Sequence, residues 1–332
     1  MKPDAARIVA RLQALKAEPW LGPARAWWPD YLFHVTDVQN AARILTSGRL
    51  LSRARCDETG AMMVDNASEQ ILAGTDPAWQ AFVRLYFRPK TPFQYQTEGF
   101  RPIGQRGGLQ AYCPMPVVFL FDAVSVLTRA GTPFSARNLA AANAQVGDDA
   151  TFFEMLPFEE IYHSSPLSEA EKRSIVHRRH AEVVVPGELD LSALRRVWCR
   201  SPAEQQTLQT LVPQRIWMRF AARVGSSPRP NLFNRLWTFV ERAELSADRI
   251  DVRLNPWSRT PGPFAARVDV LDARSRHRGS WSEPEFDSRP PNQELVIDLG
   301  ASRRLRRYWV GFWLDDRLAY AGSYSGEAED LF

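Results

Sequence analysis

The sequence predicts an α+β protein in which a mixed helix-and-sheet part is followed by a small all-β, sandwich-like part. Before about residue 213, helical periodicities alternate with short apolar runs that are typical of buried strands. After that point, short alternating runs are separated by Pro, Gly, Ser and Asp clusters, which is the pattern of a small antiparallel sandwich. A chain of 332 residues is long for one domain, so we expect two, residues 1–213 and 214–332.

The elements of the first part can be placed by apolar spacing and by capping residues. Thr36 or Asp37 can cap a helix that ends near Gly48, and Ser201 with Glu204 forms the capping-box pattern of a later helix. In chain order we expect helix 3–17, strand 31–35, helix 37–48, partial helix within 67–85, strand 85–87, a long loop over 88–116, strand 116–121, helix 123–128, a loop-rich stretch over 137–165, helix 169–176, strand 180–185 and helix 201–211.

The second part is predicted to contain strands. We expect them over residues 249–254, 266–271, 294–299 and 308–313. Trp309 and Trp313 are four residues apart, so they share one face of their strand and fit core positions. The basic run over 303–307 could contact nucleic acid, but a solvated strand end is the commoner explanation.

Composition excludes several classes of protein. The formal net charge of +4 permits nucleic-acid binding without requiring it. The cysteines Cys56, Cys113 and Cys199 are far apart, so neither a disulfide framework nor a zinc site is expected. The chain start lacks an apolar leader, and no run approaches the roughly 18 apolar residues of a membrane span. We expect a cytoplasmic protein that needs no metal and no membrane.

The first motif is His34-Val35-Thr36 at a strand end, with Asn40 in the helix that follows. A strand end that leads into a helix start gathers polar side chains and free backbone N–H groups, which suits a nucleotide. Imidazole and hydroxyl groups can bond a ribose or an amide without adding fixed charge. Thr36 as a simple cap and His34 as a core histidine explain the same residues, so both interpretations stay open.

The second motif lies over residues 84–95, where four aromatic side chains interleave with three basic ones. From Arg84 to Arg106 there are five basic residues and one acidic residue. Basic side chains attract phosphate, and aromatic rings offer faces on which bases stack. A proline-braced loop whose aromatic residues belong to the core fits equally well.

The third motif places Glu182 inside a β-branched run that follows Arg178 and Arg179. Alternate side chains of a strand share a face, so His180, Glu182 and Val184 are expected to point the same way. A carboxylate on a largely apolar strand is costly unless it is paired or used. A salt bridge to a nearby arginine and a catalytic role are both open.

In this order, the three motifs resemble those of the DarT family of DNA ADP-ribosyltransferases. That family shows a hydrophobic-His-x-Thr strand with a following Asn, then GxL, then a YF-x-P-basic-x-P block with a following Tyr, and finally a basic run with AE on a strand. The matching stretches are 33–36 with Asn40, 48–50, 86–92 with Tyr95, and 178–182. The resemblance covers roughly residues 30–212.

The resemblance implies an ADP-ribosyltransferase-like split β-sheet core that uses NAD as a substrate, without a metal, to attach ADP-ribose to a base of single-stranded DNA. It also implies a toxin of a toxin–antitoxin or phage-defence system, restrained by an antitoxin of macrodomain type or another. Glu182 would stabilise the positive charge that builds on the ribose and take a proton from the attacking base. The expected catalytic residues are Glu182, His34 and Arg84; the expected NAD contacts are His34, Thr36, Asn40, Tyr86, Phe87 and Tyr95; the expected nucleic-acid contacts are Arg88, Lys90, His163 and Arg179.

One departure from the family pattern concerns an arginine. The family usually carries a functional Arg on a helix between the first two motifs, whereas residues 65–74 contain none. Arg55 or Arg84 is the available substitute. Because this affects the phosphate contact and the acceptor, the same chemistry on RNA stays open, as does a non-catalytic nucleotide-binding or immunity module. The intact motif residues argue against the last of these.

Overall fold

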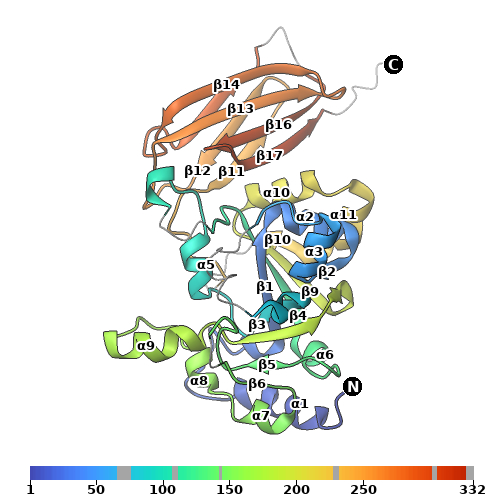
Figure 1. Ribbon diagram of the computed structural model, residues 1–332. Helices are drawn as coiled ribbons and strands as arrows, with labels where there is room; N and C mark the ends of the chain where they lie inside the picture. Colours follow the sequence, from blue (N-terminus) through green and yellow to red (C-terminus); the bar gives the residue numbers. More distant parts are fainter. Residues whose placement is uncertain (66–75, 107–110, 142–143, 227–231, 301–304, 327–332) are drawn as a thin grey trace.

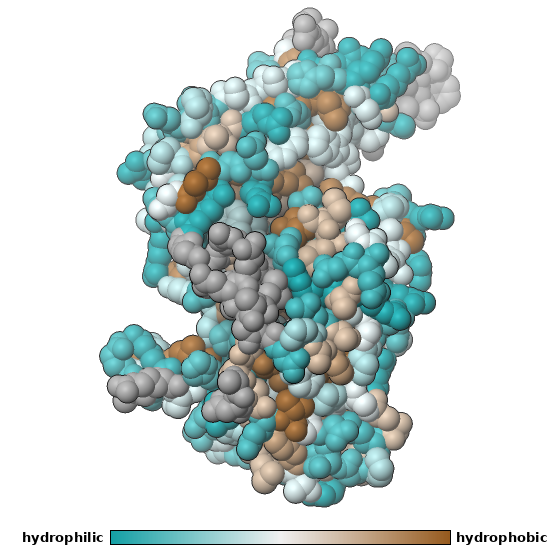
Figure 2. Space-filling view, viewed as in Figure 1, coloured by the Kyte–Doolittle hydropathy of each residue, from teal (hydrophilic) through white to brown (hydrophobic). Residues whose placement is uncertain are grey.

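The computed structural model describes residues 1–65, 76–106, 111–141, 144–226, 232–300 and 305–326. A mixed helix-and-sheet body, from which helix α9 projects, carries two antiparallel sheets at its C-terminal end (Figure 1). The predicted α+β class with a separate C-terminal β part is therefore confirmed. On the face seen in Figure 2, hydrophobic residues occur in small groups among hydrophilic ones.

An eight-stranded sheet organises the body, in the order β10-β9-β4-β1-β3-β7-β5-β6. Its strands are β1 (Tyr31–Asp37), β3 (Phe82–Tyr86), β4 (Pro116–Asp122), β5 (Phe134–Ser135), β6 (Val146–Gly147), β7 (Glu182–Pro186), β9 (Leu194–Cys199) and β10 (Val224–Ser226). β1 pairs with β4 over its whole length but with β3 at the single pair Phe33 and Tyr86. The sheet therefore splits between β1 and β3 beyond this pair. Since β10 belongs to it, the sheet extends past residue 213, and the boundary at that residue stays a prediction.

Helices and a small ladder surround the sheet. The helices are α1 (Ala5–Lys16), α2 (Val38–Ser47), α3 (Arg53–Thr59), α5 (Pro92–Thr97), α6 (Ala123–Leu127), α7 (Ala150–Glu154), α8 (Phe158–Ile161), α9 (Glu169–Arg178), α10 (Pro202–Leu211) and α11 (Gln214–Phe220). β2 (Arg49–Leu51) pairs with β8 (Glu188–Asp190). Asp37 caps α2 by accepting the N–H of Gln39, and Gly48 ends the helix at a φ of 73° that favours glycine.

Several predicted elements of the body differ from the structure. The long loop expected over 88–116 contains α5, because Thr91 caps the N–H of Gln94 and Pro92 takes the first helical turn. The strand expected over 85–87 already begins at Phe82, where β3 starts to pair with β7. Of the stretch expected to be helical in part over 67–85, residues 67–75 lie outside the described residues, and the rest contains a 3-10 helix over Pro77–Ala81 followed by β3.

The strand predicted over residues 180–185 begins only at Glu182. α9 continues to Arg178, and the chain then turns through His180, whose N–H donates to the carbonyl of His177 at 3.2 Å. His180 Nδ1 lies 3.1 Å from the carbonyl oxygen of Val176. The expectation that His180 shares a strand face with Glu182 is therefore wrong.

The C-terminal part consists of two antiparallel sheets. One contains β11 (Val240–Leu245), β12 (Arg249–Leu254) and β15 (Glu294–Asp298), and the other contains β14 (His277–Phe286), β13 (Phe264–Asp272), β16 (Arg307–Leu314) and β17 (Arg317–Ser325). Four of these strands were predicted, whereas β11, β14 and β17 were not. On β16 the buried side chains include Val310 and Phe312, and Trp309 and Trp313 share the other, half-exposed face. The two tryptophans pack against each other there, so their assignment to the core is wrong.

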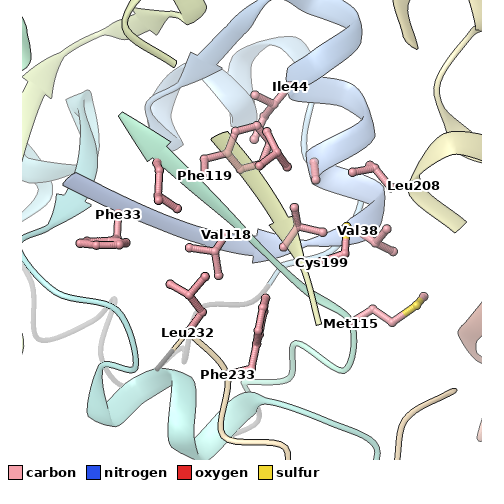
Figure 3. Packing of buried hydrophobic residues seen from close by; sticks show 14 of the residues in the cluster. Phe33, Val38, Ile44, Met115, Val118, Phe119, Cys199, Leu208, Leu232 and Phe233 are labelled. Carbon is pink, nitrogen blue, oxygen red and sulfur yellow. The ribbon is translucent and has the colours of Figure 1, made fainter. Parts of the chain in front are cut away.

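One buried cluster joins the body to the segment that leads into the sandwich. Phe33 of β1 and Val118 of β4 belong to its centre. Leu232 and Phe233 extend toward Val118 from the incoming segment (Figure 3). Burial of these side chains, each at most 1% exposed, ties the two parts of the chain together.

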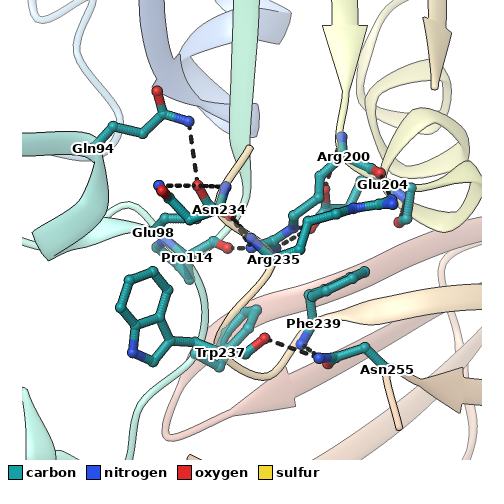
Figure 4. Close-up of polar contacts among 12 residues, drawn as sticks. Gln94, Glu98, Pro114, Arg200, Glu204, Asn234, Arg235, Trp237, Phe239 and Asn255 are labelled. Atoms are coloured by element: carbon teal, nitrogen blue, oxygen red, sulfur yellow. Dashed lines mark hydrogen bonds and ion pairs between the residues drawn. The ribbon is translucent and has the colours of Figure 1, made fainter. Parts of the chain in front are cut away.

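A buried ion network lies at the same junction (Figure 4). Arg200 is fully buried between Glu98, whose Oε1 lies 3.6 Å from Arg200 Nη1, and Glu204, which it bonds through Nε and Nη2. Glu98 also accepts the backbone N–H groups of Asn234 and Arg235, at 2.9 and 2.8 Å. These carboxylates and one guanidinium therefore connect α5, α10 and the segment that enters the sandwich.

Candidate active site

Glu182 opens β7, directly opposite Tyr86 on the neighbouring strand β3. Opposed residues of an antiparallel pair lie on the same face, and so do residues two apart on one strand. Glu182, Tyr86 and Arg84 therefore share one face of the sheet. Only 1% of Glu182 is exposed, which is unusual for a carboxylate and requires compensation or use.

The compensation for burying Glu182 is incomplete. Arg84 Nη1 lies 3.5 Å from Glu182 Oε2, a loose ion pair rather than a bidentate one. Burial raises the pKa of Glu182 to about 7, while the Arg84 charge and the backbone N–H of Leu139 oppose the rise. Within the described part of the chain, Oε2 has no hydrogen-bond partner. A buried acceptor oxygen of this kind fits the hydroxyl group of a bound ribose.

His34 meets the same strand through the backbone. Its Nδ1 lies 3.1 Å from the carbonyl oxygen of Arg84, in the region where β1 and β3 diverge. A carbonyl only accepts, so Nδ1 carries the proton and Nε2 is left as an acceptor. Burial lowers the pKa of His34, which keeps the ring neutral at pH 7. Thr36 lies further along β1 with 6% of its side chain exposed.

Asn40 braces a loop of the protein itself. Its Oδ1 accepts the N–H groups of Met63 and Val64, at 2.8 and 3.1 Å, and its Nδ2 donates to the carbonyl of Val64 at 2.7 Å. All of these bonds hold the segment just before residues 66–75. Asn40 thus braces this loop, and its direct contact with NAD stays a prediction.

Phe87 is a correction to the predicted NAD contacts. It is 1% exposed and packs edge-on against Phe158, with its ring also tilted against Phe153. Strand alternation places it on the side opposite Tyr86, inside the aromatic core. Phe87 therefore fills the core and offers no face to a ligand.

Tyr95 lies on α5 and is 46% exposed. Its ring meets the edge of Trp237, with centroids 5.1 Å apart. The start of α5 reaches the turn before the Glu182 strand, because the N–H of Phe93 donates to His180 Nε2 at 3.2 Å. α5 thus extends from the turn before Glu182 to the segment that enters the sandwich, and the place of Tyr95 beside NAD stays a prediction.

Arg88 is the second correction, because the structure buries it. It is 4% exposed, donates to the carbonyl oxygens of Pro89 and His163, and lies over the ring of Trp28 at 5.4 Å. Burial lowers the pKa of Arg88 to about 9. Arg88 therefore holds two loops together and does not present its charge at the surface for a phosphate.

His163 and Arg179 lie side by side. Arg179 Nη2 lies 2.6 Å from His163 Nδ1 and donates to the carbonyl of Ser165 at 2.7 Å. Burial and the Arg179 charge lower the pKa of His163, so the neutral ring accepts this bond. Among the described residues, no carboxylate forms an ion pair with Arg179. Lys90 sits in the left-handed region at the start of α5, where its N–H donates to Gln94.

The two substitutes for the missing family arginine occupy different places. Arg84 pairs with Glu182, whereas Arg55 pairs with Glu188, which follows the other end of β7. Of these two arginines, the structure therefore brings only Arg84 to the Glu182 carboxylate. The stretch 65–74, where the family pattern places its arginine, lies almost wholly outside the described residues.

Two contacts of Glu182 carry no signal in the sequence. Ser135 Oγ accepts the N–H of Glu182 at 3.4 Å, and the N–H of Leu139 faces its carboxylate. Ser135 ends β5 and Leu139 lies in the loop after it, and the approach of this region to β7 depends on tertiary packing. Surface hollows of about 330 and 530 Å³ lie elsewhere, and no candidate residue lines them, so the site is defined by its side chains.

The described ranges contain neither a metal-binding cluster nor a membrane-spanning helix. No cluster of three or more His, Cys, Asp or Glu there could hold a metal ion. No described helix combines the length and apolar character needed to cross a bilayer. Cys56, Cys113 and Cys199 are all free thiols.

Comparisons with known proteins give one family and one set of structures. The matching family model is described as ssDNA thymidine ADP-ribosyltransferase, DarT, and matches residues 33–228. No curated protein sequence is significantly similar to this chain. Similar solved structures are those of Thermus sp. 2.9 DarT. The complex with ADP-ribosylated ssDNA has 17% identity and a TM-score of 0.45, covering 60% of this chain and 94% of that one. The complex with NAD⁺ has 18% identity and a TM-score of 0.45, covering 60% and 96%.

The family match spans more than half of the 332 residues and contains all three motifs. It confirms the expected activity, NAD-dependent ADP-ribosylation of single-stranded DNA, with NAD as the substrate. The chain therefore belongs to the DarT family of single-stranded DNA thymidine ADP-ribosyltransferases.

Proposed function

We propose that this protein transfers ADP-ribose from NAD to a thymidine base of single-stranded DNA, with Glu182 as the catalytic carboxylate. The observation that carries the proposal is a buried carboxylate opposite Tyr86, with one oxygen that accepts no hydrogen bond and lies 3.5 Å from Arg84 Nη1. A purely structural ion pair of this burial is normally closed by good geometry on both oxygens.

Each side chain of the site has a distinct task in this proposal. Cleavage of the nicotinamide–ribose bond builds positive charge on the ribose, which the ionised Glu182 stabilises in a low-dielectric site. Glu182 also accepts the proton of the attacking base nitrogen. His34 Nε2 accepts the carboxamide N–H of nicotinamide, and Tyr86 lines the pocket beside it. Thr36 contacts the nucleotide at the end of β1.

Arg179, His163 and Lys90 provide the nucleic-acid side of the proposed site. Arg179 lacks a carboxylate partner in the described structure, and its guanidinium is fixed by His163 and Ser165. A cation held in place by neutral acceptors keeps its charge available to a phosphate. We assign contacts with the phosphates of the DNA backbone to Arg179 and Lys90. Arg88 no longer has this role.

We further propose that the protein is a cytoplasmic toxin restrained by an antitoxin, of macrodomain type or another. Modification of thymidines threatens the DNA of the producing cell, so an uncontrolled enzyme of this kind requires a partner that binds or reverses it. The three free cysteines fit a reducing compartment.

The proposal is tested by mass spectrometry of matched DNA and RNA oligonucleotides after incubation with NAD. We expect the mass of one ADP-ribose on DNA that contains thymidine and no gain on the same DNA with every thymidine replaced by deoxycytidine. A gain on RNA alone would contradict the proposal, and so would NAD binding without any modified strand.

The rate is expected to depend on pH through Glu182. The pKa of this carboxyl is raised to about 7, and the ionised form is the active one. Activity is therefore present above about pH 7 and lost as the pH falls through that value. Arg84→Gln removes the cation that lowers the pKa, so its midpoint should move to higher pH. The measurement is kcat/KM for labelled NAD from about pH 5 to pH 9. A midpoint near the ordinary glutamate value would contradict this prediction.

A further inference from the structure

Trp257 is an exposed aromatic side chain on a firmly held loop of the sandwich. It is 87% exposed, more than any other large hydrophobic residue in the described chain except Met1. On one side of it, Asn255 bonds the backbone of Phe239 and Trp237 (Figure 4). On the other side, Arg259 N–H donates to the carbonyl of Leu236 at 2.8 Å. The loop is ordered on both sides of a ring that contacts solvent.

This loop packs against the region that leads to the active site. Ser258 Oγ lies 2.8 Å from Thr238 Oγ1, and Thr260 Oγ1 donates to the carbonyl of Phe100 at 2.8 Å. Phe100 follows α5 closely, and the start of α5 bonds the turn before Glu182. These buried contacts tie the Trp257 loop to the segment that follows α5, whose start bonds the turn before Glu182.

Two arginines lie near the Trp257 loop. Arg101 lies over the ring of Trp237 at 3.9 Å, and Arg259 is exposed two residues after Trp257. In the part of the chain that the structure describes, neither forms an ion pair with a carboxylate. A guanidinium without an acidic partner attracts phosphate, and an exposed indole offers a face on which any base can stack.

We propose that Trp257, Arg259 and Arg101 bind nucleotides of the single-stranded DNA that lie outside the modified thymidine. The proposal rests on the proposed function, because the strand must first engage the Glu182 site. It gives the C-terminal sandwich a substrate-binding role: Trp257 stacks on a base, and the two arginines contact the neighbouring phosphates. The hydrogen bonds on both sides of Trp257 fix the backbone that carries the indole, so less backbone entropy is lost on binding.

The experiment measures Kd by fluorescence anisotropy for two labelled DNA strands with the same central thymidine. One has about 5 nucleotides and the other about 20, chosen around the usual site sizes of single-strand binding folds. Trp257→Ala should weaken binding of the long strand about tenfold and remove most of its advantage over the short one. Trp257→Phe should retain most of that advantage. Arg259→Gln should reduce the slope of log Kd against log salt by about 0.7, the value for one phosphate contact on a single strand.

Met218→Ala is the matched control, because Met218 is 67% exposed on α11 and belongs to no proposed site. It should keep the wild-type Kd for both strands. Equal long-strand affinity of wild type and Trp257→Ala, with ADP-ribosylation intact, would overturn this inference and leave the proposed function standing. Failure of the wild-type protein to modify any strand would overturn the proposed function, and this inference with it.

Discussion

Glu182→Gln is expected to reduce the rate of ADP-ribose transfer on the order of a hundredfold or more. The amide keeps the volume and the hydrogen-bonding oxygen of the carboxylate but loses its charge and its basicity. A charge placed in a buried site acts through a low dielectric, so its loss removes far more stabilisation there than in water. The measurement is the initial rate of labelling of a thymidine-containing strand with radiolabelled NAD, at saturating concentrations of both.

Two controls separate a chemical effect from a folding effect. Glu188→Gln makes the same change at an ion-paired surface carboxylate and should leave the rate within a factor of about two. Glu182→Gln should unfold at no lower temperature than the wild type. A carboxyl whose pKa is raised on folding costs stability as the pH rises from its unfolded value through about 7, and the amide lacks that cost. Near-normal labelling by a folded Glu182→Gln would exclude the catalytic assignment.

The sequence identified the carboxylate but not its surroundings. Glu182 can be identified from the sequence because a charged residue interrupts an apolar run. Burying such a charge is costly unless it is paired or used in the function of the protein. Its ion pair with Arg84 depends on the β3–β7 register, which joins residues far apart in the chain. Leu139 contributes only its backbone N–H, and because nearly every residue type has this group, the contact cannot be predicted from the sequence.

The aromatic-basic block shows where residue types mislead. Tyr86 and Phe87 are adjacent and both aromatic, yet strand alternation sends one to the face of Glu182 and the other into the core. Arg88 continues past the strand end, where Trp28 and the loop carbonyls enclose it. Basic residues at a loop are usually solvated, so its burial follows from tertiary packing alone.

The fold was predictable where periodicity was strong. α2 has an N-cap, an apolar face and a terminal glycine, and it occurs at the predicted residues. β17 alternates poorly, since four consecutive residues near its centre, Ala319 to Gly322, are buried on both faces. α5 has six residues, too few for an apolar repeat, and only the Thr91-Pro92 cap could have indicated it.

Arg200→Met is expected to lower the free energy of unfolding by about 3–5 kcal/mol, because it leaves two buried carboxylates without their cation. Arg200 is fully buried, Glu98 and Glu204 are at most 1% exposed, and the guanidinium also donates to the carbonyl of Pro114 at 2.8 Å. Met fills most of the volume, so the cost is electrostatic rather than a cavity. Urea unfolding followed by tryptophan fluorescence should show a midpoint lower by about 1 M or more.

The loss of stability in Arg200→Met should come from the two carboxylates that it leaves unpaired, and not from the absence of the arginine side chain itself. Burial already raises the pKa of Glu204 to about 7, and without Arg200 it must rise further, so the deficit of Arg200→Met should grow with pH above 7. Adding Glu98→Gln and Glu204→Gln removes the unpaired charges and should restore part of the stability. Arg195→Met, at an exposed pair with Asp122, should change stability by less than about 1 kcal/mol. If Arg200→Met costs no more than Arg195→Met, the buried network does not hold the sandwich segment to the catalytic body, and the apolar contacts of Leu232 and Phe233 must do so instead.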